Sequence, residues 1–344
     1  MEQTSSAFPH ALSTSRERLP EEWRLQKRAM TGMLAFVLLI QPLVLTGYFT
    51  AIPTLLNTTD PVRDVRLAQE PGIRIEPQDL TEHVPILING TADFVDQGWP
   101  GSGTEPDPFV IEALNVTYDV GLASIQVINT DAHFVIRDCY ANQMSSETAI
   151  IVQNVSHCSI EYCTVASEEA GIQAFDTSNT VLSHCDVLAD QIAVHVNASS
   201  DSTVSWNRMN STSHRGLTCR YCTGLTLSHN DITGNSPSWY AAYVGLSNHT
   251  TVTDEVSRGG VAGYAFYSVI DLSIQNLVVP QGSQQSGVSM YSVEDVSIES
   301  CEAHGNEEPG LGISNSDSTI ITGSAFSSQE SIGVLITLSN HTAM

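Results

Sequence analysis

Three side chains in the middle of the chain could carry out acid–base chemistry on a sugar polymer: Asp176, His195 and Arg220. A polysaccharide lyase needs a base, a proton donor and a cation that neutralises the substrate carboxylate, and these three residue types can supply them. A glycoside hydrolase needs a pair of carboxylates flanking the scissile bond, and the sequence shows no acidic pair clustered in that way. Catalysis by a lyase, hydrolase or epimerase through these residues is therefore one hypothesis. A solvated surface without catalysis is the one we favour.

Aromatic side chains could bind the same kind of ligand without any reaction, because their faces pack against pyranose rings. The candidates are Tyr267, Tyr291, Trp99 and Trp239. Residues 98–103 (GWPGSG) are rich in glycine but lack the lysine of a phosphate-binding loop, so we expect a turn there. The sequence thus favours polysaccharide or cell-envelope glycans as the partner.

Metal chemistry has weaker support. Cys219 and Cys222 form a C-x-x-C pair, but no second pair follows at the spacing of a zinc site. No Met/His cluster of the copper-binding kind accompanies the histidines His133, His157 and His249, and no acidic pair suggests a calcium site. The seven cysteines leave at least one unpaired, and we expect buried thiols rather than disulfides. We predict no metal and no cofactor; calcium and copper are alternatives without support.

The charge of the chain restricts its partners. It has 38 acidic and 13 basic residues, a formal net charge of −25, and only 8 of the basic residues follow residue 28. Such a surface repels phosphate backbones, so we predict no nucleic-acid binding. The chain is also 41% hydrophobic with regular patterning, which excludes disorder for the residues after about 83.

A hydrophobic segment near the N-terminus predicts a membrane anchor. Residues 29–52 contain no charged side chain, and about 20 apolar residues suffice to cross a bilayer. Because the basic cluster lies just before this segment, we expect residues 1–28 in the cytoplasm and the remainder outside a cell membrane that the chain crosses once. A cleaved signal peptide is the alternative. Residues 53–82 are expected to form a stalk, and residues 83–344 the folded domain.

The predicted outer side contains all the N-x-S/T triplets that could accept an N-linked glycan. Each triplet alone is weak evidence, because the chain is rich in asparagine, serine and threonine. The candidate acceptors are Asn57, Asn89, Asn115, Asn154, Asn197, Asn210, Asn248 and Asn340.

A repeat of roughly 23 residues must position the candidate side chains. Each repeat has two short apolar strands with period-two alternation, and glycine often precedes the first strand. The centres of the second strand recur in steps of 22 to 25 residues, at Ile136, Ile160, Leu182, Val204, Leu227, Val252, Ile274, Ile298 and Ile321. Stacked coils keep such positions in register, because each coil lies about 4.8 Å above the last. The sequence therefore predicts an all-β, single-stranded parallel β-helix, with residues 83–122 forming the cap and first coil.

A column three residues after each centre supports this interpretation. It contains Cys139, Cys163, Cys185, Asn207 and Asn230, which we expect to point inward at a bend and to form a structural ladder. On the second strand, Arg137 and Glu161 would be neighbours on adjacent coils, where a surface ion pair is the simplest expectation.

Coils such as GLTCRYCTGLTLSHNDITGN (residues 216–235) resemble the right-handed parallel β-helix repeats of the pectate-lyase-like superfamily, and more narrowly its NosD-type branch. Residues 85–116 are similar to the first coil and cap of archaeal surface proteins of that kind. The resemblance covers about residues 85–344 and implies a right-handed helix. It is specific for fold and poor for function.

Three functional hypotheses follow. We favour a membrane-anchored surface protein that binds carbohydrate or contributes to the cell envelope, as in adhesion. A catalytic role through Asp176, His195 and Arg220 is the alternative, and the NosD likeness implies a third, a copper-accessory role. The final coil begins near Gly333 and is predicted to stop before its second strand, so we expect either that the chain is truncated or that another chain covers that end.

Overall fold

The computed structural model describes residues 77–344 except 120, 122, 281–284 and 306. All described residues belong to one compact unit, Asp64–Met344. The predicted segments 1–28 and 29–52, and most of the stalk 53–82, lie outside the described residues. Within the described part of the chain, every helix is too short or too polar to cross a membrane.

The described residues form three parallel sheets, which we call sheets A, B and C. Sheet A contains β1 (Thr81–Glu82), β4 (Leu114–Tyr118), β7 (Tyr140–Gln143), β10 (Thr164–Ser167), β13 (Asp186–Ala189), β16 (Arg208–Ser211), β19 (Asp231–Gly234), β22 (Val256–Gly259), β25 (Val278–Val279), β28 (Glu302–Gly305) and β31 (Ala325–Ser328). Sheet B contains β2 (Ile86–Asn89), β5 (Ile125–Thr130), β8 (Ile150–Ser156), β11 (Ala170–Ser178), β14 (Ile192–Asn197), β17 (Arg215–Arg220), β20 (Ala242–Gly245), β23 (Ala262–Tyr267), β26 (Ser286–Tyr291), β29 (Leu311–Ser314) and β32 (Val334–Thr337). Sheet C contains β3 (Phe109–Glu112), β6 (Phe134–Arg137), β9 (Cys158–Glu161), β12 (Val181–Ser183), β15 (Thr203–Ser205), β18 (Thr226–Ser228), β21 (Asn248–Thr253), β24 (Ile270–Gln275), β27 (Glu294–Glu299) and β30 (Asp317–Thr322).

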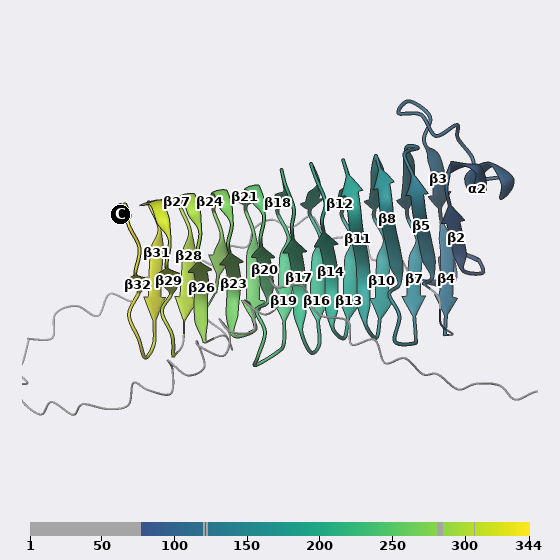
Figure 1. Cartoon of the computed structure of the whole chain (residues 1–344). Coiled ribbons are helices and arrows are strands. Elements are labelled where there is room, and N and C mark those ends of the chain that lie inside the picture. Colours follow the sequence, from purple (N-terminus) through teal and green to yellow (C-terminus); the bar gives the residue numbers. More distant parts are fainter. Residues whose placement is uncertain (1–76, 120, 122, 281–284, 306) are drawn as a thin grey trace, which may run out of the picture. The chain divides into compact units, whose positions relative to one another are not determined.

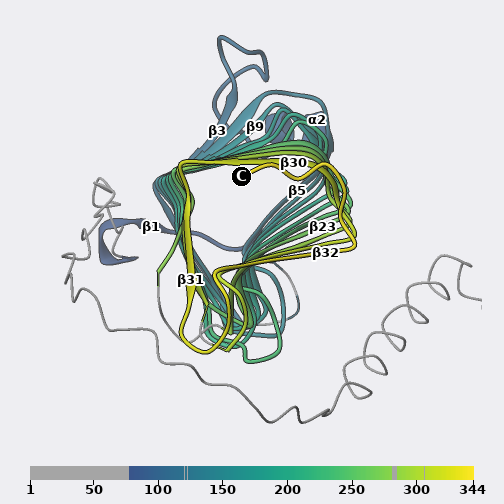
Figure 2. The same ribbon diagram turned by 90° about the vertical axis from the view of Figure 1, so that its left-hand side faces the viewer.

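The strands of each sheet are stacked along one axis, and each strand pairs with the equivalent strand of the next coil (Figure 1). The pairing register links Ile160 to Leu182 and Leu182 to Val204, as the equal steps of the repeat predict. Seen along the axis, the coils superpose and enclose a three-sided section (Figure 2). The predicted parallel β-helix is confirmed.

Side chains at alternate strand positions fill the interior. Ile160, Leu182 and Val204 are at most 3% exposed, and the other second-strand centres are buried beside them. One coil alone would leave this apolar surface in water, so the stacking of coils creates the core. The intervening positions face outward, and their side chains make up the outer surface of each sheet.

Bends between the sheets use residues in the left-handed region. Where the chain passes from sheet B to sheet C, His157, Asn179 and Asp201 lie in the bend and His249 lies at the start of β21, and all four have φ near +50°. Asparagine, aspartate and histidine tolerate this conformation better than most residues. These residues lie three positions before the centres of the second strands. The bend in the chain explains why residue types that favour turns recur at this position of each repeat.

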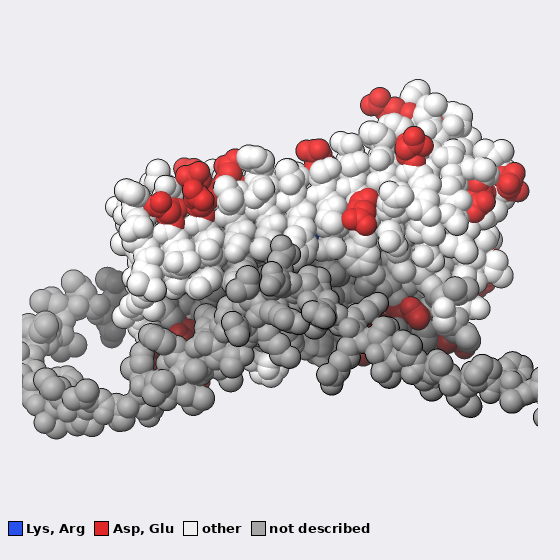
Figure 3. Space-filling model, viewed as in Figure 1, with Lys and Arg blue, Asp and Glu red and all other residues white. Residues whose placement is uncertain are grey.

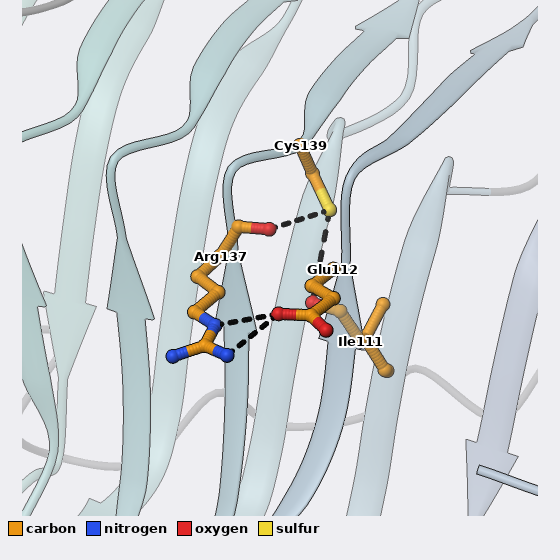
Figure 4. A network of polar contacts seen from close by, with 4 residues as sticks. All are labelled: Ile111, Glu112, Arg137 and Cys139. Atoms are coloured by element: carbon orange, nitrogen blue, oxygen red, sulfur yellow. Dashed lines mark hydrogen bonds and ion pairs between the residues drawn. The ribbon is translucent and has the colours of Figure 1, made fainter. Parts of the chain in front are cut away.

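The Cys–Asn column lies at the bend from sheet C to sheet A. The amide of Asn207 donates to the carbonyl of Leu182 at 2.9 Å and to Oδ1 of Asn230 at 3.0 Å. The amide of Asn230 in turn donates to Oε1 of Glu255 at 2.6 Å. Cys139, at the same position of an earlier coil, points its Sγ at the carbonyls of Arg137 and Ile111 (Figure 4).

Four details differ from the sequence prediction. The cap contains a short helix, α2 (Thr91–Asp96), whose Phe94 stacks on Phe109 with ring centroids 4.6 Å apart. A 3-10 turn, η1 (Pro77–Asp79), precedes this helix in the chain. Sheet A begins at Thr81, two residues before the predicted boundary. The final coil does reach sheet C, through a bridge between Ile320 and Ala343.

The fourth difference concerns Arg137. Its guanidinium binds Oε2 of Glu112, on the preceding coil, at 2.6 Å rather than Glu161 on the following coil (Figure 4). Glu161 instead accepts a hydrogen bond from Ser159. Both neighbours of Arg137 are acidic, and the side-chain rotamers, which sequence does not reveal, decide between them.

Candidate functional site

Two arginines and several aromatic rings meet on the outer face of sheet B. We call the set His195, Arg215, Arg220, Trp239 and Tyr243 the arginine–aromatic cluster. Strand β17 carries Arg215 at its start and Arg220 at its end, and β14 and β20 flank it. Alternation places Thr218 on the outer face of β17, in register with His195 on one side and Tyr243 on the other. Three consecutive coils thus build the site.

Tyr243 is the common platform of the two arginines. The guanidinium carbon of Arg215 lies 4.9 Å from the centre of the Tyr243 ring, and that of Arg220 lies 5.9 Å from it. Trp239 offers Arg215 a second ring at 4.5 Å. Such contacts stabilise a guanidinium without neutralising its charge, each by roughly 0.5–2 kcal/mol. Both cations are therefore held in place on rings and keep their charge.

The absence of carboxylates distinguishes this cluster from the rest of the domain. Residues 83–344 contain only five arginines and no lysine. Arg137, Arg208 and Arg258 form ion pairs with Glu112, Asp186 and Asp231. Within the described part of the chain, Arg215 and Arg220 have no carboxylate at ion-pair distance. Figure 3 shows acidic side chains scattered over the visible face of the β-helix.

Several polar atoms of the cluster are buried without a hydrogen-bond partner. They are Nε of Arg215, Nε of Arg220 and Nε2 of His195, and Oγ1 of Thr218, beside the cluster, is a fourth. A buried polar atom without a partner costs about 1–3 kcal/mol. These four atoms therefore leave hydrogen-bonding capacity unused on this face of the sheet, which ordered water can satisfy.

The electrostatics of the cluster follow from burial and from the two positive charges. Burial, together with the charges of Arg220 and Arg215, lowers the pKa of His195 to about 4, so its imidazole is neutral at pH 7. Burial also lowers the pKa of Arg215. For Tyr243, burial raises the pKa of the phenol, and the two arginines act in the opposite direction. The cluster can therefore accept an anion without any competing negative charge of its own.

The residues predicted from sequence are only partly brought together. His195 and Arg220 lie close to each other in the cluster. Asp176 is exposed within β11, next to Phe175, where the backbone has a φ of 51°, and it forms no hydrogen bond or ion pair with either of them. Phe175 instead packs edge-on against His195, with ring centroids 5.0 Å apart. The three residues do not converge on one point.

The aromatic candidates separate in the same way. Tyr267 and Tyr291 stack on consecutive coils of sheet B, with ring centroids 5.3 Å apart. They continue the column that contains Arg220. Trp239 belongs to the cluster. Trp99 lies in the cap, where it packs against the core, and its ring centroid is 5.7 Å from that of His83. Trp99 is therefore not part of this surface.

Sequence reasoning missed Arg215 and Tyr243. Tyr243 lies on β20, whose inward residues are Ala242 and Val244, and the small alanine weakens the apolar signal by which the other coils were recognised. A longer connection between β19 and β20 also shifts this strand relative to its neighbours. Aligning β18 and β21, whose register is regular, would have shown that a strand of sheet B had to lie between them.

Candidate metal ligands remain dispersed. No three histidine, cysteine or carboxylate side chains gather as a metal site in the described ranges. The rings of His133 and His157 stack at 4.2 Å and are nearly parallel, so their nitrogen lone pairs do not converge on one ion. All seven cysteines are buried and unpaired, including Cys219 and Cys222.

The potential glycan acceptors differ in accessibility. Asn89, Asn154, Asn248 and Asn340 are exposed, whereas Asn197 and Asn210 are half-buried. Asn115 is 6% exposed, and its amide nitrogen donates to Glu82 at 2.8 Å. Asn57 lies outside the described residues.

Comparison with known proteins gives family and fold information. The family model described as periplasmic copper-binding protein (NosD) matches residues 195–344, and the model described as right handed beta helix region matches residues 111–259. No curated protein matches the chain in sequence.

Solved structures with a similar fold share little sequence with this chain. PfbA, a surface adhesin of Streptococcus pneumoniae, is 8% identical with a TM-score of 0.50, over 80% of this chain and 76% of PfbA. A double mutant of the periplasmic alginate epimerase AlgG is 10% identical with a TM-score of 0.40, over 70% of this chain and 69% of the epimerase. The Dettilon tailspike protein is 8% identical with a TM-score of 0.47, over 74% of this chain and 61% of the tailspike. At 8% identity the likeness to PfbA concerns the fold alone.

Proposed function

Because the chain is a right-handed parallel β-helix with NosD-type repeats, we propose that it binds carbohydrate outside the cytoplasm, without catalysis, through the outer face of sheet B. We further propose that the ligand is an anionic glycan, with carboxylate or sulfate groups. The observation that carries this proposal is the pair Arg215 and Arg220, which lies on aromatic rings without a carboxylate partner among the described residues.

The charge of the protein makes this pair informative. In a chain of net charge −25, acidic partners for two arginines are abundant, yet the pair has none among the residues that the structure describes. A planar guanidinium binds carboxylate or sulfate oxygens through two parallel hydrogen bonds. The neighbouring rings of Trp239, Tyr267 and Tyr291 supply faces on which sugar rings can pack. Charge and aromatic surface together match an anionic sugar polymer better than a neutral one.

The proposal extends to the place of the protein in the cell. Residues 29–52 would anchor it in the membrane with the β-helix outside, where envelope glycans are available. PfbA is a surface adhesin with a similar fold, which is compatible with a binding role for a β-helix at a cell surface.

Equilibrium binding to polygalacturonate and to its fully methyl-esterified form tests the proposal. We expect the full chain to bind the anionic polymer and to bind the esterified polymer at least tenfold more weakly. Replacing Arg215 and Arg220 together by glutamine should abolish this difference. Arg258→Gln is the matched control, because it removes the same charge from sheet A, where Arg258 is paired with Asp231. Equal binding of both polymers, or an equal effect of the control, would overturn the proposal.

Catalysis by a lyase or epimerase is the second candidate. The observation in its favour is His195, a neutral imidazole with an unpartnered Nε2 beside two cations, which could accept a proton from a bound uronate. Elimination would release unsaturated sugars that absorb ultraviolet light, and epimerisation would change the proton NMR spectrum of the polymer. Turnover that His195→Gln abolishes would replace the binding proposal by an enzymatic one.

A further inference from the structure

We infer that Gly245 is the positioning residue of the arginine–aromatic cluster, because its missing side chain leaves the space in which the Tyr243 ring lies. The inference rests on the proposed function, since it concerns how the same site is assembled. Gly245 touches no ligand in this scheme. It acts through Tyr243 and, through that ring, on Arg215 and Arg220.

The column that contains Gly245 shows what is unusual about it. In register along sheet B, the outward residues of successive coils are Phe175, Asn197, Arg220, Gly245, Tyr267 and Tyr291. Only Gly245 lacks a side chain, and it is buried although it lies on the outer face. Another group must therefore cover it.

That group is the phenol of Tyr243, two residues earlier on the same strand. A Cβ atom placed on Gly245 would lie 2.6 Å from Cζ and 2.7 Å from Cε1 of Tyr243, and would overlap with its Oη. Real Cβ atoms do not approach other atoms so closely. The ring of Tyr243 thus lies along its strand, in the volume that any other residue at position 245 would occupy.

The backbone does not explain this glycine. Gly224 and Gly260 have φ of 69° and 71°, where residues with a side chain are strained. Gly245 is not in the left-handed region, so alanine can adopt its backbone conformation. The three atoms nearest to a Cβ atom at position 245 all belong to Tyr243, so the requirement for glycine comes from this side chain rather than from the backbone.

The orientation of Tyr243 determines where the two guanidinium groups can rest. Arg215 and Arg220 come from opposite ends of β17, and Tyr243, in register with Thr218 at the middle of that strand, is the ring that both approach. A side chain at position 245 would turn the ring away from the sheet. Each arginine would then lose this platform, and the two positive charges would no longer be held over the same coil.

Gly245→Ala in the full chain tests the inference. We expect binding of polygalacturonate to weaken about tenfold while the urea midpoint of unfolding stays the same. Gly312→Ala is the matched control: Gly312 also lies outward on sheet B, and a Cβ atom there would meet nothing within 4 Å. Unchanged binding by Gly245→Ala, or equal weakening by Gly312→Ala, would overturn the inference.

A double-mutant cycle separates positioning from general damage to the surface. Tyr243→Ala should weaken binding, and adding Gly245→Ala to it should weaken binding no further, because the ring that alanine would displace is absent. Additive effects of the two substitutions would contradict the inference.

A second readout does not depend on the ligand. NMR titration of the tyrosine ring carbons, with Tyr243→Phe to assign the signal, should show that Gly245→Ala lowers the pKa of the Tyr243 phenol, because the displaced ring becomes exposed. If the parent chain binds no anionic polymer, the proposed function fails, and this titration still decides the role of Gly245. If the pKa of Tyr243 does not change, the inference about Gly245 fails by itself.

Discussion

Replacing Glu255 by glutamine should make the β-helix more stable at high pH and leave it nearly unchanged at low pH. Glu255 follows Asn230 in the internal column and is 0% exposed. Its Oε1 accepts hydrogen bonds from the backbone and side-chain nitrogens of Asn230, at 3.2 and 2.6 Å, while its Oε2 has no partner. Burial raises the pKa of this carboxyl from 4.5 to about 8. The folded protein therefore holds Glu255 protonated at neutral pH.

The sign and size of the effect follow from proton linkage. In the unfolded chain the carboxyl ionises near its ordinary pKa of 4.5, whereas in the folded chain it stays protonated up to about pH 8. The stability that this proton provides is complete below pH 4.5 and is lost as the pH rises through about 8. Each pH unit in this window costs about 1.4 kcal/mol, so the free energy of unfolding falls by roughly 5 kcal/mol across it. Glutamine is neutral at every pH and keeps an oxygen acceptor for Asn230.

Urea-induced unfolding at pH 5, 6, 7 and 8, followed by tryptophan fluorescence, measures this difference. We expect the Glu255→Gln variant and the parent to differ by less than about 1 kcal/mol at pH 5 and by roughly 3–5 kcal/mol at pH 8. Glu299→Gln is the control, because Glu299 is exposed on the outer face of sheet C. A difference between parent and Glu255→Gln that is the same at pH 5 and pH 8 would refute the reasoning.

Three further predictions concern side chains whose environment the structure defines. NMR titration should place the pKa of His195 near 4, because burial and two arginines oppose its protonation. A saturating anionic ligand should raise this pKa by screening the two positive charges, whereas a titration midpoint near 6.5 without ligand would contradict the burial of His195. The seven cysteines should not react with a thiol reagent in the native protein and should all react in urea, because they are buried and burial raises the pKa of thiols such as Cys219. Rapid labelling of the native protein would contradict this prediction, because it would show that a thiol is accessible. If the protein is glycosylated after folding, mass spectrometry of glycopeptides should find a glycan at the exposed Asn248 and none at Asn115, whose amide nitrogen donates a hydrogen bond to Glu82. A glycan on Asn115 would contradict the burial of this side chain and its hydrogen bond to Glu82.

The fold was largely predictable because a β-helix repeats the same local problem on every coil. Inward residues at alternate strand positions must be apolar, and equivalent positions must recur at a constant step for parallel pairing to continue. Ile160, Leu182 and Val204 obey both conditions, and they stack as their spacing indicates. The boundary of the cap was less accessible, because α2 and the stacked rings of Phe94 and Phe109 occur once and have no repeat to reveal them.

The candidate site was predictable only in part. His195 and Arg220 could be assigned to neighbouring coils from the repeat. Asp176 was expected on the coil before His195, but it lies at an exposed position of β11 with positive φ and has no hydrogen bond or ion pair to His195 or Arg220. Arg215 and Tyr243 were missed, since the coil that contains β20 has a weak apolar signature and an enlarged connection.

The sequence by itself determined which residues face the core and in which order the coils stack, because both depend on periodicity along the chain. Only the tertiary structure decided which outward side chains touch, because such contacts depend on rotamers and on the space that each neighbour leaves. Arg137 binds Glu112 rather than Glu161, and Tyr243 lies over Gly245 and there meets two arginines from the adjacent coil. Periodicity specifies a scaffold, whereas the chemistry on its surface depends on contacts that do not repeat.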